Sequence, residues 1–143
     1  MCNSIDIYLD LMKRKLQWFQ DMMTLTLAQY DLIEQEDYTG LVSNLEHREK
    51  FMKEIVVANN DLNNISLGDF SSDEIAEINE IKSKIVEIKE KMVYHNSILQ
   101  DKVLEKREEC KNEIKDIHIN EKAARGYGHW DYKRESSFFD TKN

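Results

Sequence analysis

The chain has 143 residues, no proline and only four glycines, and its formal net charge at pH 7 is −8. This length holds one domain at the usual domain size, and the scarcity of turn residues excludes a fold of many short strands. The acidic balance weighs against nucleic acids and anionic membranes as partners, because both bind through clusters of lysine and arginine. With 34% charged and 41% hydrophobic residues, the composition is typical of long amphipathic helices.

Two further features of the sequence indicate where in the cell the protein is located. No stretch approaches the roughly 20 uninterrupted apolar residues that a helix needs to cross a bilayer. The first ten residues, MCNSIDIYLD, carry acids where a secretory signal carries bases. We therefore expect a cytoplasmic protein with no membrane insertion.

The first predicted helix covers residues 4–36, where apolar residues recur in alternating steps of four and three. This spacing makes a heptad seam with one polar member, Thr26. The seam comprises Ile5, Leu9, Met12, Leu16, Phe19, Met23, Thr26, Tyr30 and Ile33. A partial second apolar stripe beside it indicates two packing neighbours, and it comprises Tyr8, Leu11, Trp18, Met22, Leu25 and Leu32.

The second predicted helix covers residues 39–64 and follows a tight turn at residues 36–40. Asp37 or Thr39 is expected to cap it, because their side-chain oxygens accept hydrogen bonds from the free N–H groups of a helix start. Its apolar positions are Leu41, Val42, Leu45, Phe51, Met52, Ile55, Leu62 and Ile65.

The third predicted helix covers residues 72–120 and begins after the clearest boundary of the sequence. Ser71 and Glu74 there form the pattern of a capping box. No helix breaker follows before Gly126. The apolar period runs through Ile75, Ile78, Ile81, Ile85, Ile88 and Met92, and then through Leu99, Val103, Cys110, Ile114 and Ile117.

Together these segments predict an all-α fold, an antiparallel three-helix bundle or long helical hairpin in the order long, short, long. Residues 1–120 form the helical bundle, and residues 121–143 form an irregular aromatic C-terminal tail. The side chains expected to be buried include Leu16, Phe19, Met23, Leu45, Ile55, Ile85 and Ile88. The methionines are expected to fill the core; the alternative is that some of them line an adaptable groove for a partner helix.

Residue patterns for catalysis or metal binding are not found. The four histidines fall in no HxxxH, HExxH or Glu-x-x-His arrangement. The sequence contains no phosphate-binding glycine loop and no GxSxG motif. We expect neither an enzyme nor a metal or cofactor site.

The C-terminal tail is distinguished by its aromatic content. Five aromatic residues lie within a segment without sustained helical period: Tyr127, Trp130, Tyr132, Phe138 and Phe139. Such residues need a surface to bury them. Two interpretations stand beside each other, a lid that packs on the chain's own helices and a segment that binds a partner.

The layout resembles the flagellar type III export chaperones of the FlgN/FliT kind. Residues 36–45 read EDYTGLVSNL, with Arg48 and Ile55 downstream, and are similar to the family's acidic turn, paired leucines and basic residue. The order of a long, a short and a long helix in an acidic chain is also similar to that family. Residues 136–142 read SSFFDTK, which looks like the aromatic-Asp-Lys ending of many such chaperones.

This resemblance implies a cytoplasmic chaperone of flagellum biogenesis and protein export. Its clients would be axial flagellar subunits, the hook-filament junction or filament-cap proteins, whose amphipathic termini it would mask and deliver to the export apparatus. Client binding in the family involves the C-terminal region. Here that region contains Ile114, Ile117, Ile119, Tyr127, Trp130, Tyr132, Phe138 and Phe139. The alternative is a structural or adaptor coiled coil that acts through helix pairing or self-association, for instance as a homodimer.

Overall fold

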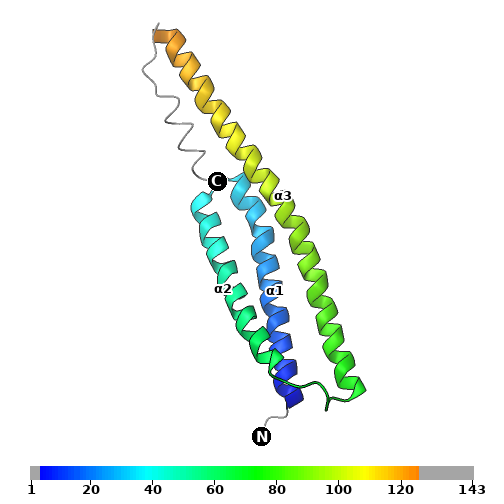
Figure 1. The fold of residues 1–143 in the computed structure, drawn as a ribbon. Coiled ribbons are helices and arrows are strands. Elements are labelled where there is room, and N and C mark those ends of the chain that lie inside the picture. Colours follow the sequence, from blue (N-terminus) through cyan, green and yellow to red (C-terminus); the bar gives the residue numbers. More distant parts are fainter. Residues whose placement is uncertain (1–3, 126–143) are drawn as a thin grey trace. The chain divides into compact units, whose positions relative to one another are not determined.

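The structure is a computed structural model that describes the backbone of residues 4–125 and the side chains of residues 4–119. It contains helix α1 (Ser4–Glu34), helix α2 (Tyr38–Asn63) and helix α3 (Ser72–Arg125) (Figure 1). No strand occurs in this part of the chain, so the predicted all-α class is confirmed. The predicted helix boundaries are within two residues of these, except that α3 ends five residues later than expected.

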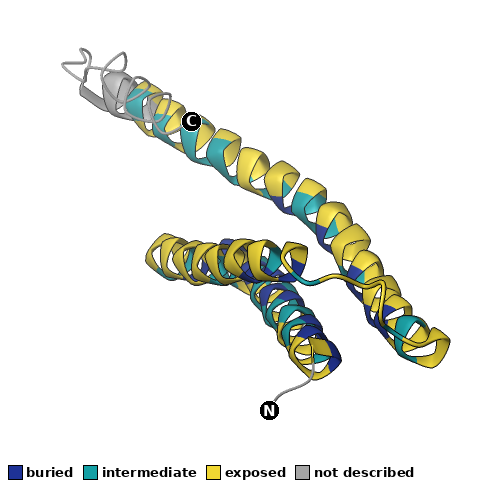
Figure 2. Ribbon diagram, turned by 60° about the horizontal axis from the view of Figure 1, so that its bottom comes forward, coloured by how far each residue is buried: buried dark blue, intermediate teal, exposed yellow. Residues whose placement is uncertain are grey.

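The chain divides into two compact units, residues 1–99 and residues 100–143, and α3 contributes to both. The first unit contains α1, α2 and the first part of α3. It holds all the fully buried side chains among residues 4–119, which lie along one side of each helix (Figure 2). In the second unit, residues 100–119 are half-buried or exposed.

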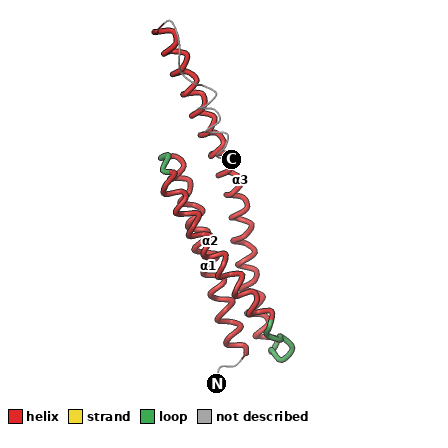
Figure 3. The backbone as a smooth tube through the Cα atoms, turned by 60° about the vertical axis from the view of Figure 1, so that its left-hand side comes forward, coloured by secondary structure: helices red, strands yellow, loops and turns green. Residues whose placement is uncertain are grey.

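A short turn joins α1 to α2, which lie side by side in opposite directions (Figure 3). The N–H of Glu36 donates to the carbonyl of Ile33 at 3.0 Å, and the N–H of Asp37 donates to that of Leu32 at 2.8 Å. These two bonds form a Schellman motif, with Glu36 at a left-handed φ of 56°. Asp37 then caps α2 by accepting from the N–H of Gly40 at 2.9 Å, which confirms one of the two predicted caps.

The start of α3 carries the predicted capping box. The N–H of Ser71 donates to Oε1 of Glu74 at 2.8 Å, and the N–H of Glu74 donates to Oγ of Ser71 at 3.2 Å. Just before it, Phe70 packs against Tyr8 of α1 with ring centroids 5.8 Å apart. The capping box therefore begins α3 at a point where the preceding loop is already held against α1.

The core of the first unit is one buried cluster with members from all three helices. On each helix the members recur in steps of three, four or seven residues, as expected of a heptad seam. The cluster comprises Ile5, Tyr8, Met12, Phe19 and Met22 of α1, Ile55 and Leu62 of α2, and Ile78, Ile81, Ile85 and Met92 of α3. Of the side chains predicted to be buried, Phe19, Ile55 and Ile85 are buried, whereas Leu16, Met23 and Ile88 are half-buried against this cluster.

The prediction for Leu45 was wrong. Its side chain is 46% exposed, and the neighbouring Asn44 is buried in its place at 6% exposure. The apolar residues at Val42 and Met52 are exposed as well. In the first part of α2 the buried position falls one residue before the predicted Leu45, at Asn44, whose amide is hydrogen-bonded. Further along the helix, Ile55 and Leu62 are buried as the apolar pattern indicates.

Candidate functional site

The residues predicted to bind a partner fall into two groups. Ile114 is half-buried on α3, and Ile117 and Ile119 are exposed there. At 100° per residue, Ile119 points away from the side that carries Ile117, so the three isoleucines do not share one face. The other five residues lie outside the described residues: Tyr127, Trp130, Tyr132, Phe138 and Phe139.

A second set of exposed apolar side chains lies on α2. Its members fall on one stripe at heptad spacing: Tyr38, Val42, Leu45, Met52 and Val56. Glu49 occupies the stripe position between Leu45 and Met52. Since Leu45 and Val56 each follow a buried residue, Asn44 and Ile55, by one position, the stripe is turned by about 100° from the core-facing side. Helix α2 therefore has an apolar face wider than the part that its neighbours cover.

The same α2 stripe continues into a pocket of about 490 Å³. Asn59 and Asn63, three and seven residues after Val56, line this pocket from α2. The other lining residues are Tyr8, Met12 and Lys15 of α1, Leu62 of α2, and Lys82, Ile85, Val86 and Lys89 of α3. The pocket thus opens between α2 and α3 and has residues of α1 in its lining; we call it the α2–α3 groove.

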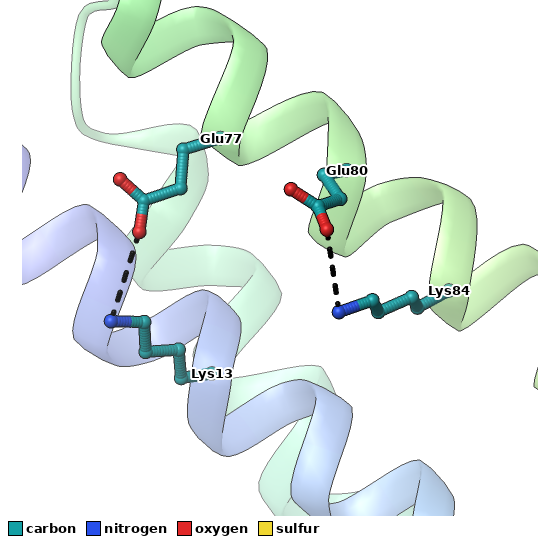
Figure 4. Close-up of polar contacts among 4 residues, drawn as sticks. All are labelled: Lys13, Glu77, Glu80 and Lys84. Carbon is teal, nitrogen blue, oxygen red and sulfur yellow. Dashed lines mark ion pairs between the residues drawn. The ribbon is translucent and has the colours of Figure 1, made fainter.

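Three lysines give the groove its charge: Lys15, Lys82 and Lys89. None has an acidic residue three or four positions away in the sequence, and none forms an ion pair with another described residue. Several lysines outside the groove are paired: Figure 4 shows Lys13 paired with Glu77 at 3.9 Å and Lys84 paired with Glu80 at 3.5 Å. The groove therefore holds three ammonium groups with which no described carboxylate forms an ion pair.

Lys15 occupies an unusual position for a charged residue. It follows Met12 by three residues and precedes Phe19 by four, and thus stands in the buried seam of α1. Burial lowers the pKa of Lys15 below its ordinary value, and the nearby charges of Lys89 and Lys82 lower it further. Lys89 itself lies over the ring of Phe19, with Nζ 5.2 Å from the ring centroid.

Replacing Lys15 by methionine is expected to stabilise the protein at pH 7 by a small amount, about 0.5 kcal/mol, since solvent screens a half-exposed ammonium group. The folded chain releases the Lys15 proton at a lower pH than the unfolded chain, so the wild type gains stability as the pH rises toward 10.5. The advantage of Lys15→Met over the wild type should therefore shrink across that window. Urea unfolding at several pH values measures this, with Lys53→Met, at a lysine paired with Glu49, as the control.

A pocket of similar size, about 510 Å³, lies between α1 and α2 but has the opposite charge character. Asp6, Asp10 and Asp61 line it. Its one cation, Arg14, is already paired with Asp10 at 3.1 Å. This pocket therefore lacks the uncompensated positive charge of the α2–α3 groove.

Elsewhere in the first unit, buried polar groups join the helices. Nε2 of Gln29 donates to Oδ1 of Asn44 at 2.9 Å, and Nδ2 of Asn44 donates to the carbonyl of Leu25 at 2.8 Å. The hydroxyl of Tyr30 hydrogen-bonds Nδ1 of His95 at 2.8 Å. Because these groups satisfy one another across helices, they hold the register of the helices rather than offer a reactive site.

Arg48 extends this polar layer from α2 to α3. One of its terminal nitrogens donates to Oδ1 of Asn96 at 3.3 Å, and burial lowers the pKa of Arg48. Among residues 4–119, no group of three histidine, cysteine or acidic side chains is placed to hold a metal ion. Over the same part of the chain, no helix is apolar enough over a sufficient length to cross a bilayer.

The three lysines that define the groove were not among the residues predicted from the sequence to have a function. The sequence does contain a signal for them. A lysine with no acidic residue three or four positions away can be told apart from a lysine such as Lys84, which has Glu80 four positions before it. That the three lysines converge on one pocket depends on the packing of α3 against α1. No known protein family matches this chain, and neither the curated proteins nor the solved structures include a match.

Proposed function

We propose that the protein binds an amphipathic helix of a partner protein in the α2–α3 groove, and that it serves in this way as a flagellar type III export chaperone. In this proposal α1, α2 and α3 form an antiparallel three-helix bundle, and the partner supplies a fourth helix. The clients are axial flagellar subunits whose apolar termini are masked in the cytoplasm until export.

The observation that carries the proposal is the exposed apolar stripe on α2. Leu45, Met52 and Val56 stand at the a and d spacing of a coiled coil, yet all three are more than 45% exposed. A helix of another protein that presents apolar residues at i, i+3, i+4 and i+7 is the natural complement of such a stripe. Met52 also fits the alternative left open for the methionines, because a flexible thioether adapts to different partner side chains.

The flagellar assignment draws on the sequence resemblance alone. The turn and first part of α2, residues 36–45, carry that resemblance and also begin the exposed stripe with Tyr38, Val42 and Leu45. The region predicted to bind clients, residues 114–139, remains part of the proposal as a second contact. Ile117 and Ile119 supply exposed apolar surface there, and the tail aromatics would add contact area at little entropic cost.

The test measures binding of the purified full chain to the C-terminal helical segments of the hook-filament junction and filament-cap proteins encoded by the same genome. Leu45→Ser is expected to weaken binding about tenfold, because it removes one apolar anchor. Leu27→Ser is the matched control, since Leu27 on α1 is 45% exposed, almost the same as Leu45 at 46%. Equal affinity of both variants and the wild type would contradict a role of the α2 stripe.

The competing function is an adaptor coiled coil that associates with itself. Sedimentation velocity of the chain alone distinguishes the two functions. A monomer that binds the flagellar segments supports the chaperone. A stable dimer that Leu45→Ser dissociates, with no binding of those segments, would replace the chaperone by the adaptor.

A further inference from the structure

The three lysines of the α2–α3 groove point to the chemistry of the helix that binds there. We propose that the groove selects a partner helix bearing carboxylate side chains, which the ammonium groups of Lys15, Lys82 and Lys89 bind while apolar residues of the same helix pack on the groove walls. This inference rests on the proposed helix-binding function, and it adds a charge requirement that the apolar stripe alone does not impose.

The first argument is the absence of any described acidic partner for these lysines. Several surface lysines of this chain pair within their own helix, as Lys53 does with Glu49 and Lys91 with Glu87. The sequence places apolar or amide residues at the corresponding positions around the groove lysines. In a chain of net charge −8, three neighbouring lysines without an acid form a local exception to the overall charge.

The second argument is the position of Lys15 in the buried seam. An apolar side chain there would extend the cluster between Met12 and Phe19, so the lysine replaces packing with a partly buried charge. Lys82 and Lys89 add repulsion between like charges. A carboxylate placed between the three ammonium groups would attract each of them. Binding of such a partner would therefore offset the repulsion between the lysines of the free protein.

The third argument is the geometry of the groove walls. Lys82 and Lys89 are seven residues apart on α3, which corresponds to about 10.5 Å along the helix. Val86 lies between them and is about half exposed. A helix that carries acidic residues one heptad apart, with an apolar residue between them, matches this alternation of charge and apolar surface.

Charge also distinguishes between the segments that could occupy the α2–α3 groove. Residues 125–143 carry four basic and three acidic side chains, so this segment of the chain is not complementary to a positive groove. An acidic helix of a partner protein is complementary. The remaining alternative is that a second copy of the chain occupies the groove. Measuring the molecular mass in solution distinguishes this alternative from binding of a partner protein.

The experiment uses two fluorescein-labelled synthetic peptides of three heptads each, with identical leucines at the a and d positions. One peptide carries glutamates on the flanking positions, and the other carries glutamines. Fluorescence anisotropy measures the dissociation constant of each peptide for the full-length protein. We expect the glutamate peptide to bind at least about tenfold more tightly, and we expect this preference to decrease with added salt.

The lysine dependence is tested by the triple variant Lys15→Gln, Lys82→Gln and Lys89→Gln. This variant should lose the preference for glutamate while keeping its affinity for the glutamine peptide. The matched control replaces Lys53, Lys84 and Lys91 by glutamine; these lysines are ion-paired and do not line the groove, and their loss changes the net charge equally. The control should keep the preference, and circular dichroism checks that both variants are folded.

The outcomes separate this inference from the proposed function. Equal affinity of the two peptides for the wild type, or equal loss of preference in both triple variants, would overturn the charge requirement and leave helix binding intact. Binding of neither peptide to the wild type would overturn this inference. Loss of flagellar-segment binding in Leu45→Ser, tested separately, reports on the proposed function alone. A protein that sediments as a dimer, and becomes monomeric in the groove triple variant, would assign the groove to a second copy instead.

Discussion

Replacing Ile78 by alanine is expected to destabilise the protein by about 2–5 kcal/mol. Ile78 is 1% exposed and belongs to the buried cluster that joins α3 to α1 and α2. Truncation removes three carbons from a site that neighbouring side chains surround, so the lost burial and the remaining cavity both add to the cost. Urea unfolding followed by circular dichroism measures the change in the free energy of unfolding.

The control for Ile78→Ala is Val93→Ala on the same helix. Val93 is 69% exposed, so its truncation should change the free energy of unfolding by less than about 0.5 kcal/mol. If both variants are as stable as the wild type, the first part of α3 does not pack on the other two helices through Ile78. Equal destabilisation of the two variants would instead mean that Val93 is covered in solution.

Replacing Asn44 by alanine is expected to cost about 1–3 kcal/mol, although the residue is polar. Its amide joins Nε2 of Gln29 to the carbonyl of Leu25, and removal leaves the buried amide of Gln29 without this partner. A double-mutant cycle with Gln29→Ala isolates the interaction, and we expect a coupling of at least about 0.5 kcal/mol. Thermal and urea unfolding of the four proteins provide the measurement.

Two comparisons make the Asn44 result interpretable. Asn60→Ala on the same helix changes an exposed asparagine, and it should alter stability by less than about 0.5 kcal/mol. Asn44→Leu restores volume without the hydrogen bonds; it should recover part of the stability but loosen the register of α1 and α2, as loss of a buried polar residue does in coiled coils. Additive effects of Asn44→Ala and Gln29→Ala would show that their hydrogen bond contributes nothing.

The helices themselves follow from local features of the sequence. The capping box of Ser71 and Glu74, the cap of Asp37 and the absence of proline act within a few residues, so their effects are the same before and after packing. The heptad period also identified side chains such as Phe19, Ile55 and Ile85 as core members, because a period of apolar residues marks the side of a helix that leaves water. The five tail aromatics and their role in binding remain a prediction.

What the period could not decide is which of two adjacent apolar stripes becomes the core. On α2, Leu45 and Asn44 differ by about 100° of rotation, and a leucine is the more hydrophobic residue at this step. The tertiary structure turns Asn44 inward because Gln29 and the carbonyl of Leu25 on α1 satisfy its amide, and it leaves Leu45 exposed. The groove has the same origin: Lys15 meets Lys82 and Lys89 only through packing between residues far apart in the chain, and no local pattern encodes that meeting.

The sequence by itself thus determined where the helices form, since that depends on neighbours along the chain. The packing of the helices decided which faces are buried and which charges converge, since those depend on partners that only the folded chain brings together.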